Sequence, residues 1–254
     1  MQRNELVSFL DGQFAAIKTA DASNNGLQVE GKDEVKAVAF AVDGCQKSFQ
    51  DAVELGADFV FVHHGISWGG GMKRITGYNA GRVGVLLRNA LSLYGMHLPL
   101  DAHPVFGNNA VLAGMLGIAP EKREGFCYYE GLDIGFGGEL PQEKSATELA
   151  AFLDQELNTQ CRVLDFAERP IRRVAIVSGG GAFAIDEAAA KGYDCLLTGE
   201  IGHQHYHYAR EQRLSVIAAG HYATETTGPM AVMRLVREHF PEVRCFFIDN
   251  PTGL

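Results

Sequence analysis

The sequence predicts an α/β fold of two pseudo-repeated lobes, each with a mostly parallel sheet flanked by helices. Short apolar runs typical of buried strands alternate along the chain with segments of helical periodicity. Two stretches of the chain are also similar enough to each other to indicate an internal repeat. Hydrophobic residues make up 46% and charged residues 21% of the 254 residues, the balance of a globular protein with a sizeable core.

The first half begins with a helical pattern and continues with alternating strands and helices. Leu6, Leu10 and Phe14 recur at helical spacing, and Gly56 is a typical residue for ending a later helix. We expect strands at 35–42, 58–62 and 91–96, and helices at 48–55, at 82–90 and from a cap at Asn108 to Leu116.

The second half repeats this alternation after an irregular segment. Residues 121–141 are rich in glycine and aromatic residues and predict irregular or hairpin structure. Ser145 and Glu148 form a capping-box pattern that opens a helix through Leu157. Expected strands at 174–177, 195–197, 216–219 and 243–248 then alternate with helices.

The internal repeat relates these two halves. VKAVAFAVDG begins at Val35 and IRRVAIVSGG at Ile171, an offset of 171 − 35 = 136 residues. Further matches pair LGADFVFV from Leu55 with KGYDCLLT from Lys191, and LSLYGMH from Leu91 with LSVIAAGH from Leu214. No linker rich in Pro, Ser and Gly separates the halves. We therefore expect two tightly packed lobes, residues 1–125 and 126–254.

The charge balance disfavours several classes of partner. With 22 Lys+Arg against 31 Asp+Glu the net charge is −9, which disfavours general binding to nucleic acid or anionic membranes. The sequence contains no run of 18 apolar residues, so we expect no membrane span. The amino-terminal residues are typical of an amphipathic helix and not of a signal peptide. The expected compartment is the cytoplasm.

The five cysteines are odd in number and widely spaced, without a Cys-x-x-Cys pair. This pattern argues against a disulfide framework and a cysteine-type zinc site. Cys195 and Cys245 lie in apolar runs and are expected to be small core residues.

Histidines and carboxylates follow the expected strands of both halves. Ligands in open α/β sheets gather beyond the carboxyl ends of the strands, so side chains at these ends are candidates for one shared site. Each half carries a His-x-x-x-carboxylate pattern, and the His pair of the first half aligns with Gly-Glu in the second. The residues are His63, His64, His97 and Asp101 in the first half, and Glu200, His221 and Glu225 in the second.

Imidazoles and carboxylates without thiolates suit Zn, Mn, Fe or Ni, and this set is large enough for two ions. Asp101 and Glu225, one from each half, are the natural bridging ligands of such a pair. The alternative is that these are ordinary polar residues at strand ends. His63 and His64 would point to opposite faces of a continuing strand, whereas a turn permitted by Gly65 would bring them together.

These residues also resemble a known family, the NIF-three-like dinuclear-metal proteins, which include the GTP cyclohydrolase I type 2 homologues. The resemblance covers nearly the whole chain. It rests on NGLQVEG from Asn25, HHGISW from His63, YGMHLPLDAH from Tyr94, GNN from Gly107, SGGG from Ser178, TGE from Thr198 and AGHYATE from Ala219. Two differences stand out: Gly65 replaces a proline frequent in the family, and the chain is too short for the domain that many members insert between the halves.

The resemblance implies a toroidal homohexamer with two divalent metal ions per chain (Zn, Fe, Mn or Ni). By position it assigns His97 to a role beside the ligands, and as metal ligands it implies His63, His64, Asp101, His221 and Glu225. The expected function is a metal-dependent hydrolase of a small molecule, either a nucleotide or a phosphoester, with Glu200 or His97 as general acid or base. The family name points to GTP and opening of its purine ring by water, although no residue pattern here reads guanine. The alternative is a non-catalytic hexameric scaffold or regulator that acts through protein partners; nucleic-acid binding is disfavoured by the charge.

Four further features allow two interpretations each. Residues 178–181 could contact phosphate through backbone N–H groups or serve tight turns. Residues 69–74 form a basic loop that could bind an anion or lie at the surface. His203 and His207, with His205 between them, fit one helix face that binds metal or one that is solvated. Trp68, the only tryptophan, could stack on a base or be partly buried.

Overall fold

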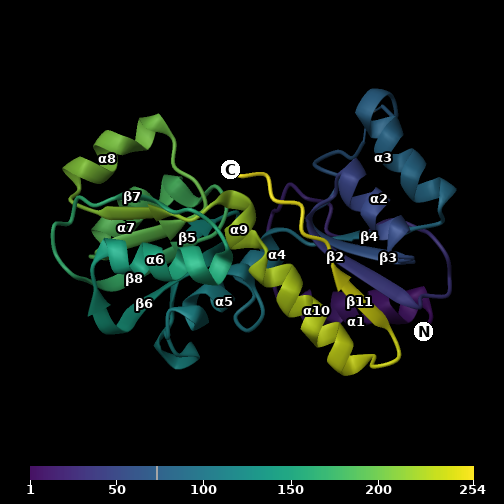
Figure 1. The fold of residues 1–254 in the computed structure, drawn as a ribbon, viewed down its shortest axis with the longest axis horizontal. Coiled ribbons are helices and arrows are strands. Elements are labelled where there is room, and N and C mark those ends of the chain that lie inside the picture. Colours follow the sequence, from purple (N-terminus) through teal and green to yellow (C-terminus); the bar gives the residue numbers. More distant parts are fainter. Residues whose placement is uncertain (73) are drawn as a thin grey trace. The chain divides into compact units, whose positions relative to one another are not determined.

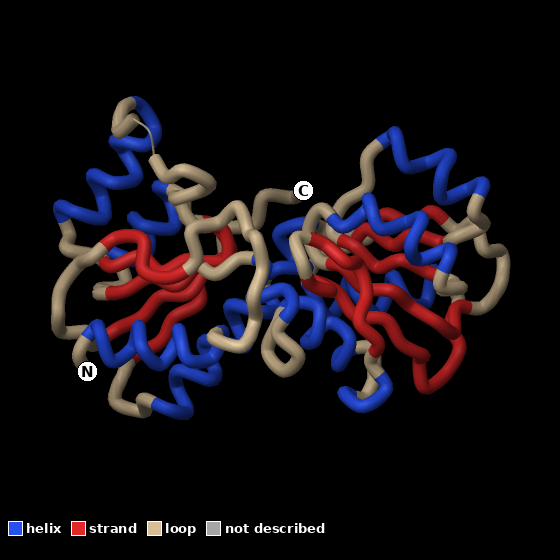
Figure 2. Tube along the Cα trace, turned by 180° about the vertical axis from the view of Figure 1, so that it is seen from behind, coloured by secondary structure: helices blue, strands red, loops and turns tan. Residues whose placement is uncertain are grey.

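The computed structural model describes residues 1–72 and 74–254, which form two compact units. Unit 1 comprises Met1–Leu100 and Gly228–Asn250, and unit 2 comprises Asp101–Thr227 and Pro251–Leu254. Figure 2 shows helices on both sides of the strands in each unit, as the α/β pattern predicts. Within the described ranges, no helix combines the length and apolar character needed to cross a bilayer.

Unit 1 contains a five-stranded sheet in the order β1-β4-β3-β2-β11 (Figure 1). The four strands β4, β3, β2 and β11 are parallel, and β1 pairs antiparallel with β4 at the edge. The strands are β1 (Gly26–Val29), β2 (Ala37–Asp43), β3 (Phe59–His64), β4 (Ser92–Gly95) and β11 (Arg244–Phe247). Because β11 pairs with β2, residues 228–250 group with the first part of the chain and not with the residues just before them.

Helices cover both faces of this sheet. Phe49 and Leu86, from two helices, pack with Val60 of β3 in the apolar cluster on one face. On the other face Tyr94 of β4 donates a hydrogen bond to Asp11, with its hydroxyl 2.7 Å from Oδ1. The first face carries α2 (Gln46–Glu54) and α3 (Gly77–Arg88), and the second carries α1 (Arg3–Phe14) and α10 (Thr227–His239).

Unit 2 contains a six-stranded sheet in the order β5-β6-β8-β9-β10-β7. Strands β8, β9 and β10 are parallel, whereas β5, β6 and β7 join antiparallel. The strands are β5 (Glu124–Tyr129), β6 (Leu132–Lys144), β7 (Arg162–Leu164), β8 (Ile171–Val177), β9 (Cys195–Thr198) and β10 (Ser215–Ala218). The glycine-rich segment is therefore the hairpin β5–β6, one of the two alternatives expected for it.

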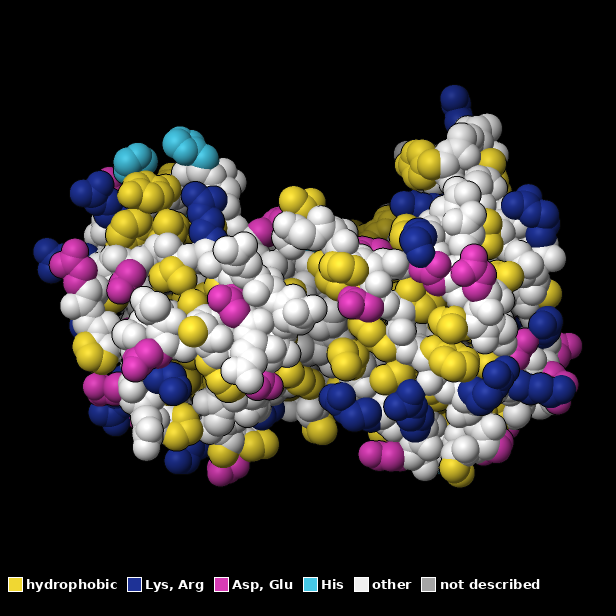
Figure 3. Space-filling view, viewed as in Figure 1, with side chains coloured by type: hydrophobic (Ala, Val, Ile, Leu, Met, Phe, Trp, Pro, Cys, Tyr) yellow, Lys and Arg dark blue, Asp and Glu magenta, His cyan; other side chains and the backbone are white. Residues whose placement is uncertain are grey.

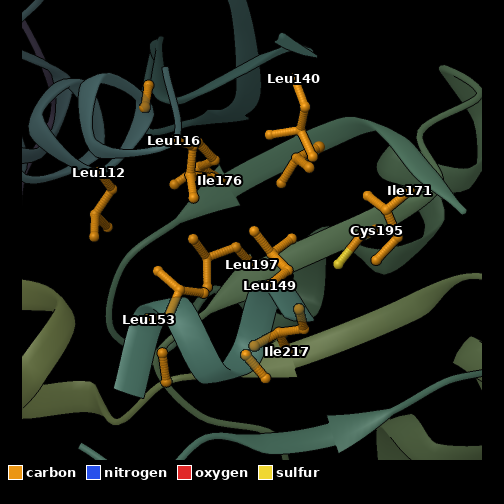
Figure 4. Close-up of a cluster of buried hydrophobic side chains, with 14 of the residues drawn as sticks. Leu112, Leu116, Leu140, Leu149, Leu153, Ile171, Ile176, Cys195, Leu197 and Ile217 are labelled. Carbon is orange, nitrogen blue, oxygen red and sulfur yellow. The ribbon is translucent and has the colours of Figure 1, made fainter. Parts of the chain in front are cut away.

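A large apolar core lies on one face of this sheet. Leu149 and Leu153 of a covering helix pack with Leu197 and Ile217 of the central strands, and Cys195 belongs to the same cluster, as predicted (Figure 4). The longer helices are α5 (Asn108–Met115) and α6 (Ala146–Leu157), and the shorter ones are α4 (Leu98–Ala102), α7 (Ile185–Ala190), α8 (Tyr206–Glu211) and α9 (His221–Glu225). Among the described residues, the 3-10 turns are η1 (Pro120–Lys122), η2 (Gly181–Ala184) and η3 (His203–His205).

The repeat extends to the strand pairing. The parallel strands β2-β3-β4 of unit 1 correspond to β8-β9-β10 of unit 2, and the antiparallel edge strand β1 corresponds to β7. The two sheets differ on the remaining side, where unit 1 adds the parallel strand β11 and unit 2 adds the antiparallel hairpin.

One aspartate in each unit accepts the same pair of backbone hydrogen bonds from the start of the neighbouring strand. Oδ2 of Asp58 accepts hydrogen bonds from the backbone N–H of Lys36 at 2.9 Å and of Ala37 at 3.2 Å, and Nζ of Lys32 lies 2.9 Å from Oδ1. Burial would raise the pKa of Asp58, but these hydrogen bonds and the Lys32 charge lower it overall. At the repeat offset, 194 − 58 = 136, Asp194 accepts from the backbone of Arg172 and Arg173 and pairs with Arg169.

Two helix starts differ from the prediction. Helix α3 begins at Gly77 and not at residue 82, because Thr76 adopts the extended N-cap conformation. The N-cap of α5 is Gly107 and not Asn108, whose side chain instead donates to Asp101, with Nδ2 2.8 Å from Oδ1. The capping box of Ser145 is present as predicted.

Candidate metal centre

Three histidine rings gather at the carboxyl ends of β3 and β4 in unit 1. The ring centroids of His63 and His64 are 4.6 Å apart, and His97 lies 5.1 Å from His63 and 5.6 Å from His64. Both histidines of the adjacent pair belong to β3, which ends at His64. One ring nitrogen from each histidine lies within 4.8 Å of one from each of the others.

An oxygen atom faces Nδ1 of each of these histidines. Nδ1 of His63 lies 3.0 Å from the carbonyl oxygen of Met96, which can only accept, so this nitrogen carries the proton. Nδ1 of His64 lies 2.8 Å from Oδ1 of Asp43. Histidines that donate from Nδ1 to an oxygen acceptor present Nε2 as the nitrogen with a lone pair, the usual arrangement of histidine ligands to metals.

Asp21 orients the third histidine. Its Oδ1 lies 2.9 Å from Nδ1 of His97, while Asn25 donates to Oδ2 at 2.8 Å and in turn accepts from the backbone N–H of His97. Burial would raise the pKa of Asp21, but hydrogen bonds from His97 and Asn25 outweigh it and lower the pKa to about 2. Asp21 is therefore an anion that fixes the tautomer of His97.

In unit 2, His221 at the start of α9 lies between two carboxylates. Its Nε2 is 3.2 Å from Oε1 of Glu225, and its Nδ1 is 3.3 Å from Oε2 of Glu200. The hydrogen bond to Glu225 is the largest cause that raises the pKa of His221 to about 9, against the effect of burial and with a further contribution from Glu200. The two acids thus favour positive charge at this position.

A glycine makes room for this pair. Gly179 has φ +61°, and a Cβ atom there would overlap Oε1 of Glu225 and lie 3.1 Å from Nε2 of His221. Its backbone N–H donates to the Thr224 hydroxyl at 3.0 Å. Close packing also explains Gly181, since a Cβ atom there would meet Val177 and Thr198. The alternative of phosphate contact at 178–181 stays a prediction.

Asp101 is buried in unit 2 within a polar network. Its Oδ1 accepts from Nδ2 of Asn108 at 2.8 Å and from the Ser178 hydroxyl at 3.2 Å. Asn109 ties the network together, because its Oδ1 accepts from the backbone N–H of Ser178 at 2.7 Å and its Nδ2 donates to Ile134. The Ser178-Gly179 step therefore contacts Asp101 on one side and Glu225 on the other.

The two His-x-x-x-carboxylate patterns behave differently within their units. His221 and Glu225 contact each other one helical turn apart, whereas His97 pairs with Asp21 and Asp101 pairs with Asn108. The repeat places Glu200 of unit 2 at the position of His64, and His221 at the position of His97. Each unit thus presents one proposed ligand and one proposed proton-transfer residue at the same two strand ends.

The sequence did not point to Asp21 and Asp43 as partners of the candidate histidines. Asp43 ends β2 beside the end of β3, so the strand-end argument that selected His64 applies to it as well. Asp21 lies before β1 in a segment without a periodic pattern, and no comparable signal marks it.

Residues 203–205 form a 3-10 turn and α8 begins at Tyr206, so His203 and His207 do not share one continuous α-helix. Both side chains are exposed, and Figure 3 shows exposed histidines over the α8 end of unit 2. Their exposure fits the solvated alternative of the prediction. Of the basic loop 69–74, residue 73 lies outside the described residues.

The donor set fits borderline divalent metals. Three imidazoles with oxygen acceptors at Nδ1 in unit 1, and a histidine flanked by two glutamates in unit 2, are ligands that Zn, Fe, Mn or Ni accept. Neither candidate ligand group found among the described residues contains a cysteine, so the donors are imidazoles and carboxylates without thiolates.

Comparisons with known proteins agree over the full length. The family model Duf34/NIF3 (NGG1p interacting factor 3) matches residues 1–253. A Pyrococcus abyssi protein named "GTP cyclohydrolase 1 type 2 homolog" is 48% identical over 255 residues and covers 100% of both chains. An Escherichia coli (strain K12) protein of the same name is 39% identical over 254 residues, 99% of both chains.

Solved structures confirm the two-lobed fold. A structure described as "protein ybgI, unknown function" has a TM-score of 0.92 at 39% identity and covers 100% of both chains. The match to the family model and the full-length identities confirm the resemblance found in the sequence. The chain therefore belongs to the Duf34/NIF3 family.

Proposed function

We propose that this chain binds divalent metal ions and uses them to hydrolyse a nucleotide or another phosphoester. The observation that carries the proposal is the cluster of His63, His64 and His97, whose ring nitrogens lie within 4.8 Å of one another. The proposed ligands from the two units are His63, His64, Asp101, His221 and Glu225, and they bind two ions per chain.

The chemistry of the donors supports this proposal. Asp43 and the Met96 carbonyl fix Nδ1 as the protonated nitrogen of His64 and His63. Such pairing raises the basicity of Nε2 and lowers the entropy lost when the ring binds a cation. Divalent cations at these positions supply Lewis acidity and lower the pKa of bound water.

Two residues are suited to proton transfer beside the ligands. Glu200 is more exposed than Glu225, with 55% against 5% of its side chain accessible, and contacts Nδ1 of His221. His97, tied to the anionic Asp21, can hold a proton at Nδ1 and present Nε2 to a substrate. We propose Glu200 or His97 as the general acid or base.

The names of the relatives suggest a nucleotide substrate. Because those names include GTP cyclohydrolase, we propose a purine nucleotide as the first substrate to screen. We also propose self-association into a homohexamer, which the family resemblance implies. The competing function is a metal-binding scaffold that acts through protein partners.

Elemental analysis of freshly purified protein tests the proposal. About two divalent ions per chain are expected, with a clear loss in a His63→Ala/His221→Ala double variant. A double variant of exposed histidines, His203→Ala/His207→Ala, is the matched control and should keep its metal. Full metal content in His63→Ala/His221→Ala protein would contradict the ligand assignment.

Turnover assays separate hydrolase from scaffold. Metal-loaded protein should hydrolyse a nucleotide or phosphoester, and Asp101→Ala should abolish turnover without changing the assembly measured by light scattering. Broad screening without any turnover, at verified metal content, would favour the scaffold.

A further inference from the structure

We infer that Trp68 is a stacking platform that binds the planar heteroaromatic ring of the substrate beside the histidine cluster, and that Gln28 positions it. This inference rests on the proposed function and adds to it the residue that recognises the ring. Stacking on an indole face accepts any planar ring, so the inference predicts binding of ring-bearing phosphates with little discrimination between bases.

The indole lies against the candidate ligands and remains open to solvent. Its ring centroid is 5.0 Å from that of His97, with the two planes at 72°, and 6.3 Å from that of His64. Although it is the largest apolar side chain in the sequence, 37% of Trp68 is exposed. Large aromatic surface left in water beside a polar site is typical of a ligand-binding position.

The backbone around Trp68 is held in place without a ligand. Trp68 forms an antiparallel bridge with Ser23, and the flanking residues bond to the same segment, Ser67 O to Asn24 N at 3.0 Å and Gly69 N to Ala22 O. The indole N–H donates to the carbonyl oxygen of Gly65 at 2.9 Å. A ring fixed at both ends loses little conformational entropy when a ligand stacks on it.

Gln28 of β1 anchors the turn that leads from the histidine pair to Trp68. Its Oε1 accepts from the backbone N–H of Ile66 at 2.8 Å and of Ser67 at 3.2 Å, while its Nε2 donates to the carbonyl oxygen of Asn24 at 2.9 Å. The amide fills the space beside Gly65, where a Cβ atom would overlap it. One side chain thus connects the segment before β1 to the turn after His64.

The charge of the surrounding sequence favours a ring that carries phosphate. Residues 59–100 contain four Lys/Arg and no Asp/Glu, in a chain whose net charge is −9. Arg82 of α3 lies over the exposed ring of Tyr78, with its guanidinium carbon 5.3 Å from the ring centroid. Figure 3 shows basic side chains around α3 on this unit. We therefore expect the ring-bearing ligand to carry phosphate, which basic side chains of this segment attract.

The experiment uses Trp68 as its own reporter, because it is the only tryptophan in the chain. GMP and AMP are titrated into metal-loaded protein, with ribose 5-phosphate as the control that lacks a ring. Both nucleotides should quench the indole emission with similar midpoints, whereas ribose 5-phosphate should leave it unchanged. Equal quenching by ribose 5-phosphate, or none by either nucleotide, would overturn the inference.

Variants test the platform by calorimetry. Trp68→Leu should weaken GMP binding about tenfold, while Trp68→Phe, which keeps a stacking face, should stay within about threefold. Both should retain the wild-type metal content. GMP binding to Trp68→Leu at wild-type affinity would refute the platform. If the wild-type protein binds no metal but GMP still quenches Trp68, only the proposed function is refuted.

The role of Gln28 has a separate readout. Gln28→Ala should shift the emission maximum of Trp68 and weaken GMP binding, because the turn loses its acceptor. Gln28→Glu keeps an oxygen acceptor for both N–H groups and should restore the emission maximum. An unchanged emission spectrum in Gln28→Ala would show that Gln28 does not position the indole.

Discussion

Replacing Gly179 by alanine tests whether the Glu225–His221 pair binds metal. Gly179 lies two residues beyond the end of β8 with φ +61°, close to the Glu225 carboxylate. A methyl group there overlaps Oε1 of Glu225 and reaches 3.1 Å from Nε2 of His221. The substitution therefore disturbs two proposed ligands without removing either.

Two effects set the size of the perturbation. A non-glycine residue in the left-handed region costs about 1–2 kcal/mol, which lowers the free energy of unfolding by that amount. The Glu225 carboxylate must also retreat by about 1 Å to restore van der Waals contact with the new methyl group. Displaced ligand geometry of this size should weaken metal binding at least about tenfold.

The neighbouring glycine supplies the control. Gly180 has φ −80°, and a Cβ atom there would find its nearest neighbour, Oε1 of Glu200, at an ordinary 3.5 Å. Gly180→Ala should therefore change the free energy of unfolding by less than about 0.5 kcal/mol and leave metal affinity near wild type. Denaturant titrations and calorimetry with Zn²⁺ measure both quantities. Wild-type metal affinity in Gly179→Ala, at confirmed fold, would refute the role of Glu225 and His221 as ligands.

Three further predictions follow from single contacts. Asp58→Asn should lower the free energy of unfolding by about 1–3 kcal/mol at pH 7; because the folded state lowers the pKa of Asp58, this difference is full above about pH 4 and should vanish as pH falls further, measured by urea unfolding. Asp43→Ala should weaken Zn²⁺ binding about tenfold in calorimetry by removing the acceptor at Nδ1 of His64, and unchanged affinity would exclude this role. Ser145→Ala should lower the free energy of unfolding by about 1 kcal/mol through loss of the N-cap, with metal content unchanged.

The parallel core of each sheet could be predicted because buried strands leave an unmistakable pattern. Residues 37–42 and 59–62 are continuous apolar runs, and they lie within β2 and β3. The edge strands β1 and β7 could not be predicted from the sequence. They have only four and three residues, which are at most partly buried and mix polar with apolar side chains. They pair because the edge of the parallel core offers unpaired backbone groups, which is a tertiary cause.

The candidate ligands could also be predicted from the sequence, because they follow predicted strands. The residues that hydrogen-bond to them could not. His63, His64 and His221 sit at strand ends, where topology alone brings side chains to one edge. Asp21 reaches His97 through a segment without regular structure, so only the folded chain reveals the pair. The domain grouping of residues 228–250 depends likewise on β11 pairing with β2, whose partners Arg244 and Ala37 are 244 − 37 = 207 residues apart in the sequence.

The repeat preserves structure at one end of the sheets and changes chemistry at the other. At the amino ends of the strands, Asp58 and Asp194 accept equivalent backbone hydrogen bonds and each pairs with a basic side chain. At the carboxyl ends, the same alignment replaces His64 by Glu200, while His97 and His221 keep their identity. A stabilising contact needs the same atoms in both units, so its conservation across the repeat reflects the fold. A pair of imidazoles in one unit and a histidine with carboxylates in the other give different donors at matching positions, an asymmetry that the fold alone does not require and that the proposed ligand binding would explain.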